Sequence, residues 1–316
     1  MIKKNVPLKD YSNYKIGGLA SYFLEITSKK DLLDGLREWR EISTDFDENK
    51  KKIFVLGKGT NVLINDLGFN GLVIHNNILG IEKKGEEVTV GAGVLVADFL
   101  NFCIENNLAG FEWAGGLPGT IGGAVRGNAG AFGGETKDSV KEVTSFNLET
   151  LSQVSRDSRE CNFGYRFSVF KSSAGFKEII LSVVLKLKTR EKNFIKQSIQ
   201  EKIDYRIARH PLEYPNIGSI FKNIAYESLS PELKTEWREY IKNDPFAVIP
   251  AAKIIFLGGL RGKRVGDAKI SEKHTNFIIN LGNATSKDVK ELIEEVKKDI
   301  YDKFGLNLEE EIMYLD

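Results

Sequence analysis

The 316-residue sequence has few of the residues that build disulfide-stapled, metal-binding or membrane-spanning proteins. It contains two cysteines, Cys103 and Cys161, without CxxC spacing, so neither a disulfide framework nor a cysteine-based metal site is expected. No run approaches the ~18 apolar residues of a membrane helix, and the first residues lack the apolar core of a signal peptide. The formal net charge of +1 gives no field that would gather nucleic acid or a membrane surface.

The remaining composition is that of an ordinary globular protein. The apolar share is 41% and the charged share is 28%, which together support well-filled hydrophobic cores. The length predicts two domains. Cys103 lies on the apolar side of a helical pattern and is expected to be a buried thiol. We therefore expect a cytoplasmic protein that binds no metal, nucleic acid or membrane.

Glycine, in contrast, is abundant and concentrated in one stretch. Trp113 to Glu135 reads WAGGLPGTIGGAVRGNAGAFGGE, in which nine of 23 residues are glycine. A flexible linker has few apolar residues, whereas this stretch carries several, so a linker is the less favoured interpretation. Glycine allows close approach of the backbone to a ligand, and successive N–H groups form a concavity for anions. The segment Gly119–Gly123 is accordingly predicted to bind a phosphate.

A second glycine turn precedes it. The apolar run 53–56 predicts a buried strand, which continues into Gly57-Lys58-Gly59-Thr60-Asn61 and a further apolar run at 62–64. The turn is not a GxxxxGK[ST] loop, because Gly59 follows Lys58 where Ser or Thr is required. It is not a GxGxxG motif either, because Val62 occupies the position of the third glycine. A second phosphate-binding group of N–H donors is predicted at 57–61.

The hydrophobic pattern predicts an α+β fold with many strands, because strands and helices do not alternate regularly as in a Rossmann domain. The charged segment 191–209 has a stripe of Ile195, Ile199, Ile203 and Ile207 and is expected to form a helix that links two domains. Other helices are expected at 28–40, 95–107 and 231–242, and from the cap at Thr285 to Phe304; strands are expected at 71–74, 87–90, 143–148 and 179–185.

Taken with several later segments, the two glycine stretches resemble the UDP-N-acetylenolpyruvoylglucosamine reductase family. The resemblance runs from about Tyr14 to Ile312. The sequence departs from the family pattern at Leu19 and Glu310, where prolines are usual, at Met313, where an arginine is often found, and in an insertion at 224–249. The later matching segments are 161–171, Gly218-Ser219 with Phe221-Lys222-Asn223, 251–255, 260–268, 271–280 and the terminal strand 308–312.

The resemblance implies a fold and a reaction. The fold is α+β, with an FAD-binding module of the PCMH or vanillyl-alcohol-oxidase type over 1–190, in two subdomains that divide near 75. A smaller α+β substrate-binding domain over 191–316 contains the insertion, which is expected to lie on the surface. The reaction is NADPH-driven reduction of UDP-N-acetylglucosamine enolpyruvate to UDP-N-acetylmuramate in peptidoglycan precursor synthesis. FAD is bound non-covalently, and the enzyme is expected to be a monomer.

The resemblance also implies roles for individual residues. Arg166 would stabilise the anion formed on the substrate, Ser219 would donate a proton to carbon, and Glu311 would lie near the anion. Substrate contacts are implied for Tyr165, Lys222, Asn223, His274 and Asn276, of which His274 is as readily structural. Cofactor contacts are implied for Gly57, Lys58, Gly59, Thr60, Asn61, Val62, Pro118, Gly119, Thr120, Gly122, Gly123, Ala124, Asn128 and Gly130.

Two other functions share part of this pattern. Another FAD-dependent oxidoreductase acting on a sugar or a hydroxy acid would have similar glycine loops but would not need Gly218-Ser219 or Glu311. A non-catalytic protein that binds flavin or a nucleotide sugar would tolerate the departures at Leu19, Glu310 and Met313. Flavin absorption that bleaches with NADPH and returns with the enolpyruvyl UDP-sugar would distinguish all three.

Overall fold

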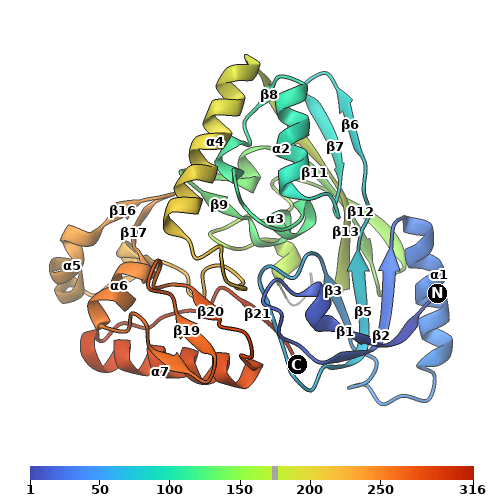
Figure 1. The fold of residues 1–316 in the computed structure, drawn as a ribbon. Helices are drawn as coiled ribbons and strands as arrows, with labels where there is room; N and C mark the ends of the chain where they lie inside the picture. Colours follow the sequence, from blue (N-terminus) through green and yellow to red (C-terminus); the bar gives the residue numbers. More distant parts are fainter. Residues whose placement is uncertain (173–176) are drawn as a thin grey trace. The chain divides into compact units, whose positions relative to one another are not determined.

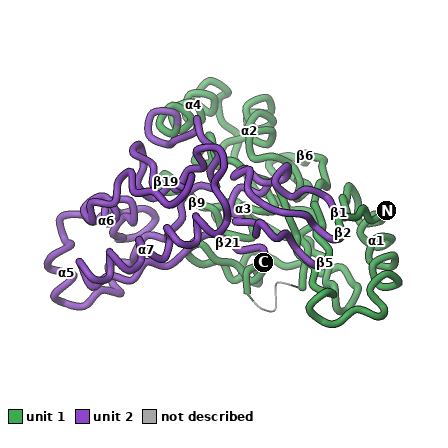
Figure 2. Tube along the Cα trace, turned by 60° about the horizontal axis from the view of Figure 1, so that its bottom comes forward, with its two compact units in different colours: residues 1–4, 22–57, 71–206 green, residues 5–21, 58–70, 207–316 purple. Residues whose placement is uncertain are grey.

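The computed structural model describes residues 1–172 and 177–316. The chain forms two compact units, coloured in Figure 2. Unit 1 comprises 1–4, 22–57 and 71–206, and unit 2 comprises 5–21, 58–70 and 207–316. Both units are therefore discontinuous in sequence. The predicted domain boundary at 190 stays a prediction, since unit 1 continues to the end of 206.

Helices and strands are interspersed along the chain, as expected for an α+β fold (Figure 1). The helices are α1 (Lys29–Ile42), α2 (Val96–Glu105), α3 (Ile121–Gly127), α4 (Lys192–Arg209), α5 (Pro231–Trp237), α6 (Ala251–Gly258) and α7 (Ser286–Phe304). The strands of four or more residues are β1 (Lys3–Pro7), β2 (Leu19–Ile26), β3 (Ile53–Leu56), β5 (Phe69–Asn76), β6 (Ile81–Lys84), β7 (Glu87–Gly91), β11 (Val140–Asn147), β12 (Ser152–Asp157) and β13 (Glu178–Lys186). The shorter strands are β4 (Val62–Ile64), β8 (Leu108–Ala109), β9 (Gly130–Ala131), β10 (Gly134–Glu135), β14 (Lys188–Thr189), β15 (Ile224–Ala225), β16 (Lys242–Asn243), β17 (Ala247–Ile249), β18 (Arg264–Val265), β19 (Ala268–Ile270), β20 (Ile278–Asn280) and β21 (Met313–Leu315).

Unit 1 is built mainly on a five-stranded antiparallel sheet in the order β12-β11-β13-β7-β6. Residues of β7, β11 and β13 share a hydrophobic core with α2, α3 and α4. Both cysteines are buried in this core, so Cys103 is the buried thiol that its helical position predicted. Burial raises the pKa of each thiol to about 12, which keeps both thiols protonated at neutral pH.

A second sheet, in the order β1-β2-β5-β3, has α1 packed against it. The predicted start of α1 is confirmed, because the Ser28 hydroxyl accepts the N–H of Asp31 at 3.1 Å. Leu32 and Trp39 project from one side of this helix into the core. The strand that precedes the first glycine turn, β3, pairs in parallel with β5.

Helix α4 packs directly on the glycine-rich stretch of unit 1. A Cβ atom on Gly115 would stand 2.6 Å from the carbonyl oxygen of Ile199, and one on Gly116 would stand 2.9 Å from Cδ of Arg206. Gly116 also has a φ of +71°, which favours glycine. These two glycines therefore allow α4 to pack closely on the glycine-rich stretch, rather than allowing a ligand to approach it.

The predicted stripe on α4 is correct for its first three members and wrong for the fourth. Ile195 and Ile199 are buried and Ile203 packs against the same core, but Ile207 is 56% exposed. Each four-residue step turns about 40° beyond a full circle, so the stripe is about 120° away from its origin at Ile207. Arg206 lies only about 20° from the direction of Ile195 and is buried in its place.

Unit 2 contains the sheet β18-β19-β20 and the helices α6 and α7, which pack around one hydrophobic core. Helix α7 begins at Thr285 in a capping box with Asp288 and ends at Gly305, as predicted. The segments 5–21 and 58–70 belong to the same unit. Tyr14, which is fully buried, donates its hydroxyl to the carbonyl of Ile278 at 2.9 Å, and β4 pairs in parallel with β21.

Two expectations about unit 2 need correction. The terminal strand is 313–315, so residues 308–312 precede it rather than form it. The insertion at 224–249 forms the sheet β15-β17-β16 and the predicted short helix, but this helix, α5, ends at Trp237 rather than at 242. Its Trp237 is 2% exposed and packs edge-on against Phe304 of α7, with ring centroids 5.2 Å apart. An apolar anchor thus ties this polar segment to the core.

Candidate functional site

Arg166 stands at the tip of a tight turn in unit 1. Gly164 and Phe167 exchange both backbone hydrogen bonds, at 3.0 and 3.2 Å, and enclose Tyr165 and Arg166. Arg166 has a φ of +54°. This conformation costs a residue other than glycine about 1–2 kcal/mol and is often found at functional positions. An arginine at a position that suits glycine indicates that its side chain is required there.

The turn is held by residues of the glycine-rich stretch. Asn128 is fully buried, with a φ of +42°, and its amide nitrogen donates to the carbonyl of Gly164 at 2.8 Å and to Glu135 at 3.0 Å. The amide oxygen of Asn128 accepts the N–H of Lys137 at 3.0 Å. Asn128 was predicted to contact the cofactor, but its side chain is engaged in tying the Arg166 turn to the glycine-rich stretch.

The guanidinium of Arg166 returns to the same stretch. Nη2 donates to the carbonyl of Gly130 at 2.9 Å, and the group lies 5.0 Å from the centre of the Tyr165 ring. A Cβ atom on Gly130 would stand 3.3 Å from Nη1, so this glycine gives the guanidinium its room. Tyr165 and Gly130, predicted to contact substrate and cofactor, both lie against the predicted catalytic arginine.

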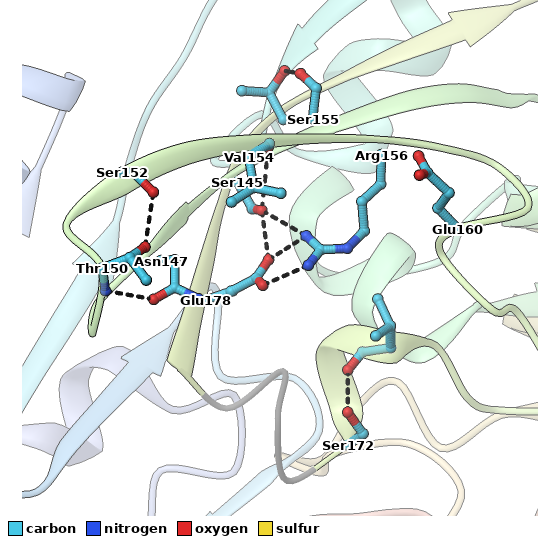
Figure 3. A network of polar contacts seen from close by, with 12 residues as sticks. Ser145, Asn147, Thr150, Ser152, Val154, Ser155, Arg156, Glu160, Ser172 and Glu178 are labelled. Atoms are coloured by element: carbon cyan, nitrogen blue, oxygen red, sulfur yellow. Dashed lines mark hydrogen bonds and ion pairs between the residues drawn. The ribbon is translucent and has the colours of Figure 1, made fainter.

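A buried ion pair supports the segment that follows Arg166 (Figure 3). Arg156 of β12 and Glu178 of β13 form two hydrogen bonds, at 2.5 and 2.7 Å, and Glu178 also accepts the Ser145 hydroxyl of β11 at 2.7 Å. The guanidinium of Arg156 lies 5.7 Å from the ring centre of the buried Phe170. The pair therefore joins three strands to the segment containing Phe170, four residues beyond Arg166.

Gly57, the first residue of one predicted cradle, lies beside Thr120 of the other within unit 1. A Cβ atom on Gly57 would stand 2.9 Å from Oγ1 of Thr120, which is buried and caps α3 by accepting the N–H of Gly123. The N–H groups of Ile121 and Gly122 donate to the carbonyls of Val94 and Ala92, both at 2.9 Å. The predicted nest at 119–123 is therefore wrong in part, because most of its N–H groups are already bonded within the protein.

The turn at 57–61 differs in this respect. Among the residues that the structure describes, no carbonyl or side chain accepts the backbone N–H groups of 57–61. Gly59 has a φ of +62°, and a Cβ atom there would stand 2.2 Å from the carbonyl oxygen of Tyr11. Its carbonyl accepts the N–H of Asn13 at 3.1 Å, so the turn is fixed while its donors stay available. The donors fit the diphosphate of FAD.

Unit 2 pairs the two segments that contain the other two predicted catalytic residues. The segment containing Ser219 runs antiparallel to the segment containing Glu311, with an isolated bridge between Phe221 and Glu310. The N–H of Glu311 donates to the carbonyl of Ile220 at 2.8 Å. Ile220, the residue after Ser219, therefore lies opposite Glu311, and the two predicted catalytic residues stand on adjacent segments. Both are half-buried, and Gly218, with a φ of +82°, lies directly before Ser219.

Two of the predicted asparagines hold this arrangement in place, and a third bonds elsewhere. Asn276 clamps Phe221 with its side chain: the amide oxygen accepts the N–H of Phe221 at 3.0 Å, and the amide nitrogen donates to its carbonyl at 2.8 Å. Asn61 donates its amide to the carbonyl of Glu311 at 3.2 Å and accepts the N–H of Met313 at its own carbonyl. Asn223 accepts the N–H of Ala251 at 3.1 Å. Asn276 and Asn61 therefore position the Ser219 and Glu311 segments.

The remaining predicted residues of unit 2 range from exposed to buried. Lys222 forms an ion pair with Glu309, and Val62 is buried in β4 opposite Met313. Lys58 is exposed, and Thr60 is half-buried. His274 packs against the rings of His210 and Phe277, with centroids 5.2 and 4.8 Å away. Burial lowers the pKa of His274 to about 4, so the ring is neutral at physiological pH.

Sequence reasoning did not find Arg206, a buried arginine on α4 in unit 1. Burial, and then the charge of Arg166, lower the pKa of Arg206 to about 10. Its spacing of seven and eleven residues from Ile199 and Ile195 was the available signal, because both spacings place Arg206 on the buried side of the helix.

Two features are absent from the described part of the chain. Within 1–172 and 177–316, no group of three or more His, Cys, Asp or Glu side chains has the arrangement of a metal site. No helix in the same residues has the length and apolarity needed to cross a bilayer.

Comparison with known proteins places this site in a class. A family model for an FAD-binding domain matches residues 35–149. Together with the free donors of 57–61, this match defines the chain as an FAD-binding oxidoreductase of the predicted α+β type. A second family model, for the C-terminal domain of UDP-N-acetylenolpyruvoylglucosamine reductase, matches residues 210–315.

Relatives match over nearly the whole chain. The UDP-N-acetylenolpyruvoylglucosamine reductase of Listeria innocua is 34% identical over 98% of this chain and 94% of its own length. The corresponding protein of Lachnoclostridium phytofermentans is 35% identical over 98% and 91%. The crystal structure of the reductase from Thermus caldophilus superposes with a TM-score of 0.76 at 30% identity, covering all of both chains. The chain belongs to the UDP-N-acetylenolpyruvoylglucosamine reductase family.

Proposed function

We propose that the protein reduces UDP-N-acetylglucosamine enolpyruvate to UDP-N-acetylmuramate with NADPH as the reductant and FAD bound non-covalently. The observation that carries this proposal is the pairing of the Ser219 and Glu311 segments, reinforced by the hydrogen bond from Asn61 to Glu311. An FAD-binding protein that only holds its cofactor would need neither residue beside the 58–62 segment. FAD, when bound, supplies a carrier for the hydride that NADPH provides.

Arg166 is proposed to stabilise the charge that appears on the substrate. Addition of hydride to the terminal vinyl carbon leaves an anion that spreads into the adjacent carboxylate. A guanidinium is always charged, planar and able to form two parallel hydrogen bonds with a carboxylate. The bond to the carbonyl of Gly130 and the contact with Tyr165 limit the freedom of the guanidinium before substrate arrives.

Ser219 is proposed to hold the proton that is delivered to the second vinyl carbon. Its hydroxyl has no hydrogen-bond partner among the described residues, so its donor remains available. A serine hydroxyl is a weak acid and needs a neighbour that stabilises the alkoxide it leaves behind. Glu311, on the paired segment, is proposed to act in that proton transfer, and Tyr165, Lys222 and Asn223 are proposed to contact the UDP-sugar.

The two half-reactions separate these roles in one experiment. In stopped flow, NADPH should bleach the flavin absorption of the wild-type protein, and the enolpyruvyl UDP-sugar should restore it. Ser219→Ala should keep the NADPH half-reaction near normal while the sugar half-reaction slows by about 10²–10⁴-fold, the range for loss of a general acid. Two intact half-reactions in Ser219→Ala would overturn the role of Ser219. Flavin that is bleached by NADPH but not reoxidised by the enolpyruvyl UDP-sugar would instead point to another FAD-dependent oxidoreductase.

We also propose that the enzyme works in the cytoplasm as a monomer. Both cysteines are buried free thiols, which suits a reducing compartment. Light scattering coupled to size-exclusion chromatography would measure the mass in solution, and a mass near twice 35.4 kDa would contradict the monomer.

A further inference from the structure

Arg206 is a buried cation whose hydrogen bonding is incomplete. Its side chain lies in the last turn of α4 and is 8% exposed. Nε donates to the carbonyl of Gly115 at 2.8 Å, and the guanidinium lies 5.4 Å from the ring centre of Phe132. Nη2 is buried and has no hydrogen-bond partner in the described part of the chain. A buried donor without an acceptor is costly unless a ligand completes it.

The charge of Arg206 is also unbalanced. Within residues 1–172 and 177–316, Arg206 forms no salt bridge with a carboxylate, and the nearby charge that opposes its ionisation is that of Arg166. Two guanidinium groups thus act on one another in unit 1. Taking a cation out of water costs several kcal/mol when no anion compensates for it. Folding tolerates this arrangement, and a negatively charged ligand would turn the repulsion into attraction for both cations.

One short hairpin carries both contacts. Strands β9 and β10 pair across the turn 132–133. The carbonyl of Gly130 accepts Nη2 of Arg166 at 2.9 Å, and the ring of Phe132, two residues along, lies beneath Arg206. Phe132 has a φ of +53° and also packs edge-on against Tyr205, with ring centroids 5.1 Å apart. This strained hairpin therefore fixes the two guanidinium groups on one piece of backbone.

The chain makes room for Arg206 at a further place. A Cβ atom on Gly116 would stand 2.9 Å from Cδ of Arg206, so any larger residue would displace the side chain. If Arg206 served only to cap the carbonyl of Gly115, one donor would suffice. The rest of the guanidinium would then be buried without any interaction that compensates for its desolvation. An anionic ligand explains three observations on Arg206 together: its burial, its unused donor and its proximity to a second cation.

We propose that Arg206 acts with Arg166 as an anion-binding pair that takes an anionic oxygen group of the UDP-sugar substrate. This inference rests on the proposed function. The group is either the enolpyruvyl carboxylate or the diphosphate, which share the chemistry of negatively charged oxygens that accept planar paired donors. Arg206 is a substrate-binding residue in this proposal, and the proton and the hydride are moved by other groups.

The test measures ligand affinity with the oxidised flavoprotein, from the change in flavin absorption on titration. The variants are Arg206→Met, Arg206→Lys and Lys196→Met, the last of which removes a cation from an exposed position of the same helix. The ligands are the enolpyruvyl UDP-sugar and UDP-N-acetylglucosamine, which lacks the carboxylate. NADPH reduces the flavin, so its effect is compared by the rate of bleaching. Thermal unfolding of each apoprotein confirms that each variant is folded.

Arg206→Met should weaken binding of the enolpyruvyl UDP-sugar by about 10- to 100-fold, the worth of one hydrogen bond to a charged group. Arg206→Lys should lie between this variant and wild type, and Lys196→Met should bind as wild type does. Loss for the enolpyruvyl UDP-sugar alone identifies the carboxylate, whereas equal loss for UDP-N-acetylglucosamine identifies the diphosphate. Bleaching of the flavin by NADPH should keep its wild-type rate in all three variants.

Several results would overturn the pair. Wild-type affinity for both UDP-sugars in Arg206→Met is one, and a loss confined to the rate of bleaching by NADPH is another. If Arg206→Met does not fold, wild-type affinity in Arg206→Lys has the same meaning, because a lysine that keeps the bond to Gly115 has no planar second donor. Failure of the proposed function looks different, since the wild-type protein itself would then fail to bind the enolpyruvyl UDP-sugar.

Discussion

Asn128 combines a positive φ with a side-chain amide whose oxygen and nitrogen are both hydrogen-bonded. Replacing Asn128 with alanine leaves the carbonyl of Gly164, the carboxylate of Glu135 and the N–H of Lys137 without their partner. We expect Asn128→Ala to lower the free energy of unfolding by about 3–5 kcal/mol. Asn128→Gly should be about 1 kcal/mol less harmful, because glycine adopts the positive φ without strain.

Flavin content and the sugar half-reaction separate the two possible roles of Asn128. If the residue positions the Arg166 turn, Asn128→Gly should keep its flavin while reduction of the UDP-sugar slows by 10-fold or more, on the order expected for a misplaced catalytic group. If a variant with wild-type stability loses its flavin, this result would instead support the cofactor contact of Asn128 that the sequence predicts. Chemical denaturation and the visible spectrum provide both measurements.

His274 makes stability depend on pH at the acidic side of neutrality. Burial lowers its pKa from 6.5 to about 4, so between these values the unfolded chain binds a proton that the folded chain does not. Above pH ~6.5 the neutral ring therefore contributes its full stability. As pH falls towards 4, the free energy of unfolding decreases by on the order of 3 kcal/mol because this contribution is lost. Thermal melts from pH 7.5 to 4.5 compare wild type with His274→Gln. Their melting temperatures should differ at pH 7.5 and approach each other as the pH falls. A constant difference at every pH would contradict this account.

At the scale of elements, the sheet of unit 1 depends on one buried ion pair. The side chains of Arg156 and Glu178 are 21% and 6% exposed. Arg156→Ala leaves the carboxylate buried without its partner, and we expect a loss of about 3–5 kcal/mol in stability. Arg159, three residues further along the chain and 95% exposed, provides the control: Arg159→Ala should change stability by less than about 0.5 kcal/mol.

A double variant tests whether the pair contributes net stability or only prevents the harm of an unpaired charge. Arg156→Met with Glu178→Leu removes both charges and keeps apolar volume, so it should recover most of the loss. Equal losses in the single and the double variant would show that the hydrogen bonds themselves stabilise the sheet. Urea denaturation measures all four proteins.

The elements also show what a sequence can predict. Apolar periodicity and capping residues predicted α1, α2, α4 and α7 to within a few residues, since those signals act over one or two turns. The exposure of Ile207 and the burial of Arg206 were missed, although the rotation of 100° per residue implies both. The bonding of the glycine-rich N–H groups was out of reach, because the acceptor at Ala92 lies about 30 residues away in sequence and contact across that span has no local signal.

The whole molecule is harder to predict from sequence because each unit is assembled from separated segments. The resemblance correctly predicted the FAD-binding module and the C-terminal reductase region. It gave no indication that 5–21 and 58–70 are built into the same unit as 207–316. Tyr14 and Leu63, both fully buried in the core of unit 2, carry no local pattern that assigns them to a segment some two hundred residues later. Such a division depends on long-range contacts rather than on periodicity.

This assembly leads to a prediction about fragments. Expressed alone, residues 191–316 would lack Tyr14, Leu63 and the strand β4 that pairs with β21. Removal of these buried groups should cost more than the stability of a domain this small, since one large buried side chain alone is worth about 3–5 kcal/mol. We expect a narrow, poorly dispersed amide NMR spectrum and no cooperative thermal transition. Tyr14→Phe in the full chain is the matched control, because it removes only the hydroxyl bonded to Ile278 and should cost about 1 kcal/mol. A dispersed spectrum with cooperative unfolding would show that 191–316 folds by itself, as the sequence-based boundary supposes, and that the early segments only complete it.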